Sequence, residues 1–522
     1  MPLPAINPTK TNAWKALETH IQEIKDKQMQ DVFYKETTRA DRFKIEWKDF
    51  YVDYSKNRVT DKTISLLLNL AEEVGLKEAI IQQFSGKPIN QTEGRAVLHT
   101  ALRDLNNLKP EVASTLQKMK DFSEEIISGK HKGFSGKPIT DVVNIGIGGS
   151  HLGPEMVTDA LQFYRNHLNI HFIANIDGDD VEEVLKKLNP ETTLFIVVSK
   201  SFTTQETIVN ATVVRDWFLR SAVEENIQSH FVAVSANIKG AIDFGISEDN
   251  IFPMWDWVGG RFSLWSSVGL SICCAVGYHN FEAILKGASE MDDHFKNEEF
   301  DKNIPVVLAL LSIWYNNFFK VESEAVVAYS QYLNKLVPYL QQAIMESNGK
   351  NIDRNGDKIN YQTGTIVWGN VGSNSQHAYF QLLHQGTKLI PTDFIGFSKP
   401  LLGNFKNHNI LMANYLAQTE ALWEGTYNKE VEKPFKFFEG NKPTNSILIK
   451  KLTPNSLGKL IAMYEHKLFV QGIIWNIFSY DQWGVELGKT VAKETLSSIE
   501  NKNASEVKNP STQNLIKKLL DS

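Results

Sequence analysis

Short apolar runs alternate with amphipathic segments from about residue 140 onward, and this rhythm limits what the chain can fold into. The first runs occur at 142–145, 171–174, 194–198 and 231–234. They are rich in Val, Ile and Phe and too short for helices, while helical patterns separate them. Parallel strands that are buried on both faces and joined by helices have this texture. The pattern predicts a doubly wound parallel sheet.

A second series of the same kind follows at 325–329, 365–368, 388–394 and 447–452. Two series of one kind indicate an old duplication. The predicted fold class is α/β, with two doubly wound, mostly parallel sheets, each an α/β/α sandwich, and helical N- and C-terminal extensions.

The domain organisation is predicted from changes of pattern, because no linker or low-complexity tract divides the chain. Helical spacing dominates the first 110 residues and returns at 456–478 and 485–499, before a polar tail at 500–522. The predicted parts are a helical N-terminal region that packs on the large domain (1–110), a first domain (111–288), a second domain with C-terminal helices (289–510) and a tail (511–522).

Composition excludes several classes of protein. The formal net charge of the 522 residues is -6, with no basic stripe for nucleic acid or anionic lipid. Serines interrupt the longest uncharged stretch, 262–278, which favours a buried helix over a membrane span. The start lacks a secretory pattern, and the two cysteines, Cys273 and Cys274, are adjacent. We expect a cytoplasmic protein without disulfides.

The nonapeptide GIGGSHLGP, residues 146–154, follows the first predicted strand and opens an amphipathic segment. Its glycines let the main chain approach a ligand, and the first N–H groups of a helix attract negative charge. Ser150 adds a hydroxyl. The segment predicts an anion cradle for a phosphorylated or otherwise anionic small molecule.

Dinucleotide binding is the rival interpretation of this turn. The fingerprint G-x-G-x-x-G, laid on Gly146 and Gly148, requires glycine where His151 stands. An acidic residue, Asp177, does follow the next predicted strand. The nucleotide alternative is therefore weak but open.

A second anion-binding candidate, SKSFTTQET at 199–207, follows the strand predicted at 194–198. Its hydroxyl side chains and one lysine would lie at the carboxyl end of a parallel strand, where α/β sheets bind ligands. The alternative is a capping box formed by Thr203 and Glu206. The cradle two strands earlier favours the ligand interpretation.

Three further segments carry polar side chains beside glycines or turns. A guanidinium behind two glycines can offer a planar fork of donors, and a carboxylate before a turn can project into a cleft. In isolation, a structural role for each is the more ordinary interpretation. The segments are VGGRFSLWSS with Arg261, QQAIMESNGK with Glu346, and SYDQWGVELGK with Gln482 and Lys489.

His377, in NSQHAYFQLLHQG, begins a helical segment, a position where histidine is usually a cap or a packing residue. Metal binding is not predicted, because the sequence has no H-E-x-x-H pattern or Cys and His cluster. The stretch 353–357 resembles a calcium loop, but Lys358 replaces the required glycine.

Taken together, these motifs closely resemble the glucose-6-phosphate isomerase family, also called phosphoglucose isomerase. GIGGSHLGP, SKSFTTQET, VGGRFSLWSS, QQAIMESNGK, NSQHAYFQLLHQGT and IIWNIFSYDQWGVELGK match the family's motifs in order. The likeness runs from TEGRAVLHTALRD at Thr92 nearly to the end. It implies two sugar-isomerase domains and the reversible conversion of glucose 6-phosphate to fructose 6-phosphate, in glycolysis and gluconeogenesis.

The resemblance also implies roles for individual residues. Glu346 would move a proton between C2 and C1 through a cis-enediolate, which Arg261 would stabilise. His377 and Lys489 would open the sugar ring. The implied substrate-binding residues are Gly149, Ser150, Ser199, Lys200, Ser201, Thr204, Thr207, Gly260, Gln342 and Gln482.

No metal or organic cofactor is implied, because a proton shuttle with a stabilised enediolate needs none. The family is usually a homodimer whose active sites are completed across the subunit contact. Two alternatives stay open: a non-catalytic sugar-phosphate sensor, and an isomerase for mannose 6-phosphate or an amino sugar, which differs only around C2.

Overall fold

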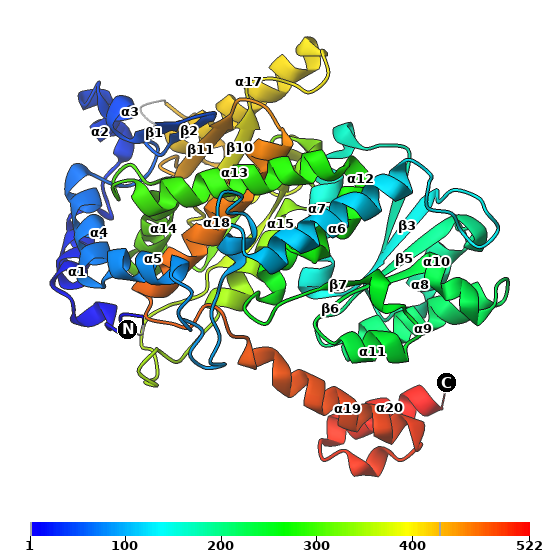
Figure 1. The fold of residues 1–522 in the computed structure, drawn as a ribbon. Helices are drawn as coiled ribbons and strands as arrows, with labels where there is room; N and C mark the ends of the chain where they lie inside the picture. Colours follow the sequence, from blue (N-terminus) through cyan, green and yellow to red (C-terminus); the bar gives the residue numbers. More distant parts are fainter. Residues whose placement is uncertain (1–2, 427–429, 522) are drawn as a thin grey trace. The chain divides into compact units, whose positions relative to one another are not determined.

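The computed structural model describes residues 3–426 and 430–521, so Met1, Pro2 and Ser522, at the ends of the predicted N-terminal region and tail, lie outside it. Its internal contacts divide the chain into two units, Met1–Ser479 and Tyr480–Ser522. The first unit holds both sheets (Figure 1). The predicted domain boundaries are a different division and stay a prediction.

The first sheet is parallel throughout, in the order β4-β3-β5-β6-β7. β3 pairs with both β4 and β5, so the chain crosses from one side of β3 to the other between these strands. This is a topological switch point, where α/β sheets form ligand crevices at the carboxyl ends of their strands. The strands are β3 (Asp141–Ile145), β4 (Asn169–Ile173), β5 (Thr193–Val198), β6 (Phe231–Ser235) and β7 (Ile251–Pro253).

The second sheet has the order β1-β2-β11-β10-β8-β9. Its parallel part repeats the arrangement of the first sheet, since the first strand, β8, again lies between the second and the third. An antiparallel hairpin from the N-terminal region extends it beside β11. The strands are β1 (Lys44–Trp47), β2 (Phe50–Asp53), β8 (Ser323–Ala328), β9 (Ile366–Val371), β10 (Thr392–Phe397) and β11 (Thr444–Ile449).

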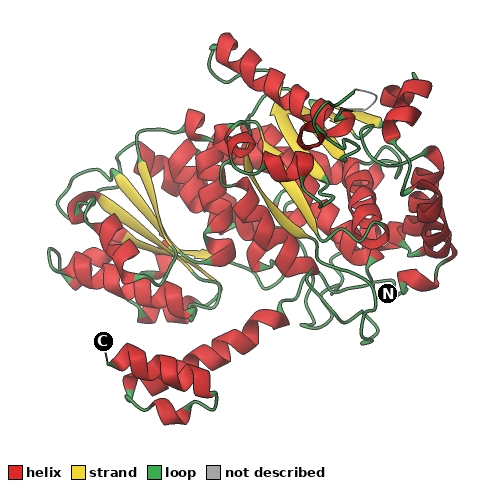
Figure 2. Ribbon diagram, turned by 180° about the vertical axis from the view of Figure 1, so that it is seen from behind, coloured by secondary structure: helices red, strands yellow, loops and turns green. Residues whose placement is uncertain are grey.

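Helices surround the two groups of strands, which are separate in Figure 2. Those of the first unit are α1 (Asn12–Ile24), α2 (Met29–Lys35), α3 (Arg39–Arg42), α4 (Asp61–Glu73), α5 (Leu76–Phe84), α6 (Pro110–Ile127), α7 (Leu152–Ala160), α8 (Gly178–Leu185), α9 (Gln205–Leu219), α10 (Ile227–His230), α11 (Ile238–Asp243), α12 (Leu270–Val276), α13 (Tyr278–Asn297), α14 (Ile304–Ile313), α15 (Leu336–Leu340), α16 (Phe380–Gln385), α17 (Phe405–Glu424) and α18 (Pro454–Ile474). The second unit has α19 (Glu486–Glu500) and α20 (Pro510–Leu520).

The core explains why these runs become strands and helices. Every residue of β5 and β6 is buried, as their unbroken apolar sequences require. α18 is buried on all sides and packs against α13 and α14 (Figure 1). Its apolar residues lie in the core of the first unit, but Glu465, His466 and Lys467 are buried there too.

Several expectations from the sequence are wrong in detail: the strand predicted at 447–452 is β11, three residues earlier, and the N-terminal region predicted as helical contains β1 and β2. The strand predicted at 388–394 is β10, which begins only after Pro391, because proline lacks the N–H that a central strand donates. The predicted polar tail contains α20, an amphipathic helix that Asn509 caps by accepting from the amides of Ser511 and Thr512. The strand β7 has only three residues and was not predicted.

Candidate active site

The GIGGS turn leaves the carboxyl end of β3 and continues through a short 3-10 helix, η3 (Gly148–Ser150), into α7. Gly148 has φ +58°, in the left-handed region that glycine adopts without strain. The buried Asn144 holds the turn, since its Nδ2 donates to the carbonyl oxygen of Ser150 at 3.0 Å. The turn is thereby fixed at the edge where ligands bind.

Gly149 brings a second predicted motif against this turn. A Cβ added to Gly149 would lie 1.9 Å from the carbonyl oxygen of Gly260, so any larger residue would push the two backbones apart. Gly260 begins another 3-10 helix, η8 (Gly260–Trp265), and has open space where its own Cβ would be. Two glycine segments far apart in the sequence therefore meet.

The SKSFTT loop follows β5, the neighbour of β3. Its Phe202 has φ +53°, a strained conformation for a residue with a side chain, and is anchored in the core. The capping-box alternative is wrong, because α9 begins at Gln205 and no side chain caps it. Ser199 Oγ donates to Thr204 Oγ1 at 3.4 Å. The buried Thr207 Oγ1 has no hydrogen-bond partner among the described residues. An orphaned hydroxyl here favours the ligand interpretation.

Lys200 ties this loop to the segment before Gly260. Its Nζ donates to the carbonyl oxygens of Asp256 and Val258 at 3.1 and 3.2 Å. Burial lowers the pKa of Lys200, while the Asp256 carboxylate acts in the opposite direction. A cavity of about 400 Å³ lies beside it, lined by Ser201, Thr204 and also Arg95. Sequence reasoning missed Arg95, although it belongs to the TEGR segment of the resemblance.

Glu346 ends a wide helical turn that continues α15. Residues Gln341–Glu346, named η12, form a π-helix, a rare geometry that often marks functional sites. Gln342 and Glu346 are four residues apart and so share a face of this turn. A Cβ on Gly148 would lie 3.0 Å from Gln342 Nε2, which shows that η12 adjoins the GIGGS turn.

Arg261 links Glu346 to η8 and is almost fully buried. Its Nε donates to Ser347 Oγ at 2.7 Å and its Nη2 to the carbonyl oxygen of Ser479 at 2.6 Å. Its Nη1 lies 3.4 Å from Glu346 Oε2. These contacts orient the guanidinium, and the carboxylate remains about one-fifth exposed. The pair sets a cation and a base side by side.

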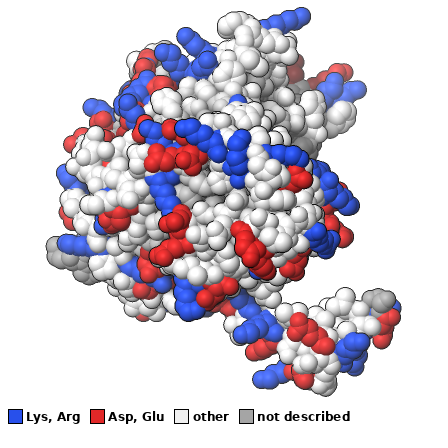
Figure 3. Space-filling model, turned by 45° about the vertical axis from the view of Figure 1, so that its right-hand side comes forward, with Lys and Arg blue, Asp and Glu red and all other residues white. Residues whose placement is uncertain are grey.

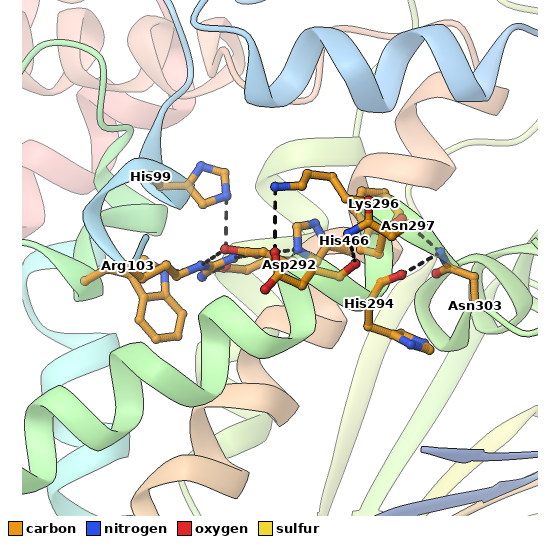
Figure 4. A network of polar contacts seen from close by, with 12 residues as sticks. His99, Arg103, Asp292, His294, Lys296, Asn297, Asn303 and His466 are labelled. Carbon is orange, nitrogen blue, oxygen red and sulfur yellow. Dashed lines mark hydrogen bonds and ion pairs between the residues drawn. The ribbon is translucent and has the colours of Figure 1, made fainter. Parts of the chain in front are cut away.

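A buried polar cluster lies behind η8 (Figure 4). Arg103 donates to both oxygens of Asp292 and, through Nη1, to Glu465. Glu465 also accepts from Trp265 Nε1 at 2.9 Å, and His466 Nε2 lies 2.6 Å from Asp292. Burial would raise the pKa of Asp292, but the Arg103 cation lowers it to about 2. Through Trp265 the cluster holds the end of the segment that carries Arg261.

The structure thus brings together four predicted motifs, those with Gly149, Ser199, Arg261 and Glu346. His377 ends a 3-10 helix (Asn374–His377) after β9 and is exposed. Gln482 and Lys489 belong to the second unit, where Lys489 Nζ pairs with Glu486 Oε1 at 2.9 Å. The part that these three play in the site stays a prediction.

The surface charge and the arrangement of potential metal ligands indicate no further functional site in the described residues. Figure 3 shows basic and acidic side chains interspersed on the visible face. In residues 3–426 and 430–521, no three His, Cys, Asp or Glu side chains form a metal-binding group. Within the same ranges no helix has the length and apolar character to cross a membrane.

These features define a class: an α/β protein in which a glycine turn at a sheet's switch point adjoins an arginine paired with a carboxylate. Residues 53–516 match the family described as Phosphoglucose isomerase. The chain belongs to this family.

Similar proteins agree with that assignment. The glucose-6-phosphate isomerases of Christiangramia forsetii and Buchnera aphidicola are 61% and 54% identical to it, over 98% of this chain and at least 97% of theirs. A crystal structure of a glucose-6-phosphate isomerase from Chlamydia trachomatis has a TM-score of 0.88 and 32% identity, over 98% of this chain and 99% of that one.

Proposed function

We infer that this member of the phosphoglucose isomerase family interconverts glucose 6-phosphate and fructose 6-phosphate, and we propose that Glu346 moves the proton. The observation that carries the proposal is the Arg261–Glu346 pair beside the glycine turn. A carboxylate beside a fixed cation can take a proton from C2 of the open-chain aldose and return it to C1.

Arg261 stabilises the intermediate of this transfer. Removing the C2 proton places negative charge on the enediolate oxygens, and a guanidinium already held by Ser347 and Ser479 needs little reorganisation to meet it. Gln342, on the same helical face as Glu346, orients the sugar hydroxyls, and Gln482 is assigned the same role.

The phosphate lies at the other end of the proposed site. Hydroxyls of Ser150, Ser199, Ser201, Thr204 and Thr207 bind its oxygens, with the backbone at Gly149 and Gly260. The orphaned Thr207 hydroxyl supports this assignment. Lys200 and Arg95 add positive charge at the edge of the cavity. A dianion held here positions C1 and C2 at the carboxylate.

Ring opening is assigned to His377 and Lys489, which can exchange protons with the ring oxygen and the C1 hydroxyl. We propose that the chain is a cytoplasmic homodimer. The exposed position of His377 supports an active site completed across the subunit contact. The chemistry moves protons only, so no metal or cofactor takes part in any step.

The test is a coupled assay of glucose 6-phosphate formation with a chelator present. We expect turnover in the wild type, and a loss of at least about 100-fold in Glu346→Gln with substrate still bound. Glu322→Gln, an exposed glutamate next to the amino end of β8, is the control. Near-normal turnover in Glu346→Gln means that the base is misassigned. If the wild type shows no turnover but still binds fructose 6-phosphate, the alternative of a non-catalytic sugar-phosphate sensor is supported instead.

A further inference from the structure

The third parallel strand of each sheet, β5 in the first and β10 in the second, carries the same sequence pattern. TLFIVVSK at 193–200 and TDFIGFSK at 392–399 share Thr, Phe, Ile, Ser and Lys at equal positions. The structure gives both the same register, since β5 and β10 each begin at the Thr and end just before Ser-Lys. Each is the third parallel strand of its sheet, and the first four parallel strands have the same order in both sheets.

Packing alone explains only part of this repeat. The shared Thr, Phe and Ile are buried in both strands, as core positions require. Ser398 and Lys399 are exposed beyond the strand, where no core constrains them. Their backbone geometry also repeats: Ser199 N donates to Val234 O of β6, and Ser398 N donates to Ile449 O of β11, the next strand in each sheet.

A cavity of about 560 Å³ lies at this second switch point. It is reached by residues that follow β8, such as Ser330, and by Lys399, which follows β10. The start of α17 lines it with Asn407 and His408. Leucines and an isoleucine supply an apolar wall, namely Leu401, Leu402, Ile410, Leu411 and Leu452.

The charge of this lining favours an anion. It contains a lysine and a histidine but no Asp or Glu. Lys399 forms no ion pair with a carboxylate of the described residues, in contrast to Lys200, whose Nζ lies 3.5 Å from Asp256 Oδ1. His408 Nε2 is buried without a hydrogen-bond partner in the same ranges. A cation and an unsatisfied imidazole at a strand–helix crevice are suited to phosphate.

We propose that the crevice between β8 and β10 is a second ligand site, which binds a small organic phosphate. Lys399 and the side-chain amide of Asn407 contact the phosphate. The apolar wall contacts the carbon skeleton. Part of the argument rests on the proposed function, because that proposal assigns Ser199 and Lys200 to a phosphate. The cavity and its charge are independent of it.

Binding stoichiometry tests the proposal on the full chain. Glu346→Gln prevents turnover, so titration with fructose 6-phosphate counts sites at equilibrium. We expect two equivalents per chain, and only one after Lys399→Met or Asn407→Asp is added, with the lost site weakened at least tenfold. Asn407→Asp sets a carboxylate in the cavity without shortening the side chain. Lys406→Met, an exposed lysine outside the lining, is the matched control and should keep both equivalents.

The two proposals fail in different ways. A single equivalent that neither cavity variant affects overturns the second site, while turnover in the wild type still supports the isomerase. Two equivalents, one sensitive to Lys399→Met, support the second site even if the wild type shows no turnover. Loss of both equivalents in Lys399→Met and in Lys406→Met alike also overturns it, because the effect is then not specific to the cavity.

Discussion

Thr207 offers a test of the phosphate assignment that separates binding from stability. Its hydroxyl is buried on α9 and has no protein partner in the described ranges, so valine of similar shape removes no internal hydrogen bond. We expect Thr207→Val to change the free energy of unfolding by less than about 1 kcal/mol and to raise the KM for fructose 6-phosphate.

The matched control is Thr158→Val, on α7. Thr158 Oγ1 is likewise buried and unpartnered in the part of the chain that is described. Thermal melts should leave both variants near the wild type, and only Thr207→Val should change KM. Equal KM values in the two variants would remove Thr207 from the phosphate pocket.

Some residues of the proposed site could be picked out in the sequence, because their residue types suit the proposed chemistry. Glycines before a helix and hydroxyls after a strand signal an anion cradle whatever their partners are. Arg95 could not be found this way, since a lone arginine in a loop has no local pattern and only the fold brings it beside Ser201 and Thr204. The hydrogen bonds of Arg261 to Ser347 and Ser479 are equally invisible in sequence.

At the scale of elements, the contact of η3 with η8 depends on Gly149. A Cβ there would meet the carbonyl oxygen of Gly260 at 1.9 Å, and backbone cannot move aside as a side chain can. Gly149→Ala should therefore destabilise the fold by about 1–3 kcal/mol and lower kcat/KM. Gly178→Ala, where a Cβ meets nothing within 4 Å, is the control for both measurements. Wild-type stability and kinetics in Gly149→Ala would contradict the close approach.

The cluster behind η8 gives a second prediction at this scale. Arg103→Met leaves Asp292 and Glu465 buried without their cation, which typically costs about 3–5 kcal/mol. Denaturant unfolding should show this loss, and turnover should fall because Glu465, which accepts from Trp265 Nε1, loses its own cation. Arg165→Met, which breaks a partly exposed pair with Asp159, should cost less than about 1 kcal/mol. Similar losses in both variants would show that the buried ion pairs of Arg103 stabilise the fold no more than a partly exposed pair does.

Which elements could be predicted depended on their burial. β5 and β6 lie in the middle of a sheet, so their sequences are nearly continuous apolar runs with clear ends. β1 and β2 were missed because they are short, half-buried and partly charged, and only pairing with β11 makes them strands. β10 was misplaced because KLIPTDFIGF contains two apolar runs, one on each side of Pro391. Only the pairing of β10 with strands on both sides makes the missing N–H of this proline exclude the first run from the strand.

At the scale of the whole molecule, the predicted duplication is reflected in the two sheets. The parallel strands of the second sheet follow the same order as those of the first, with β8, β9, β10 and β11 corresponding to β3, β4, β5 and β6. Sequence rhythm was enough to predict two such sheets. It could not predict that α18 packs against α13 and α14, because a fully buried helix has no amphipathic face to reveal its neighbours.

Three buried histidines near α13 and α18 also make the stability of the molecule depend on pH. His99, His294 and His466 are buried there. Burial lowers the pKa of each, to about 4 for His294 and well below the ordinary value for His99. In the unfolded chain they would titrate near pH 6.5, so below that pH the unfolded state binds protons that the folded state does not. The contribution of these histidines to stability is therefore present in full above about pH 6.5 and is lost as the pH falls below it.

We expect the free energy of unfolding to decrease between pH 6.5 and 5 by up to about 1.4 kcal/mol per pH unit for each of these histidines. Denaturant titrations at pH 7.5, 6.5 and 5.5 measure it. His294→Gln keeps an acceptor for the amide of Ile304 and should flatten the slope, whereas His279→Gln, exposed on the same helix, should not. A slope unchanged by His294→Gln would mean that this imidazole takes up its proton without unfolding.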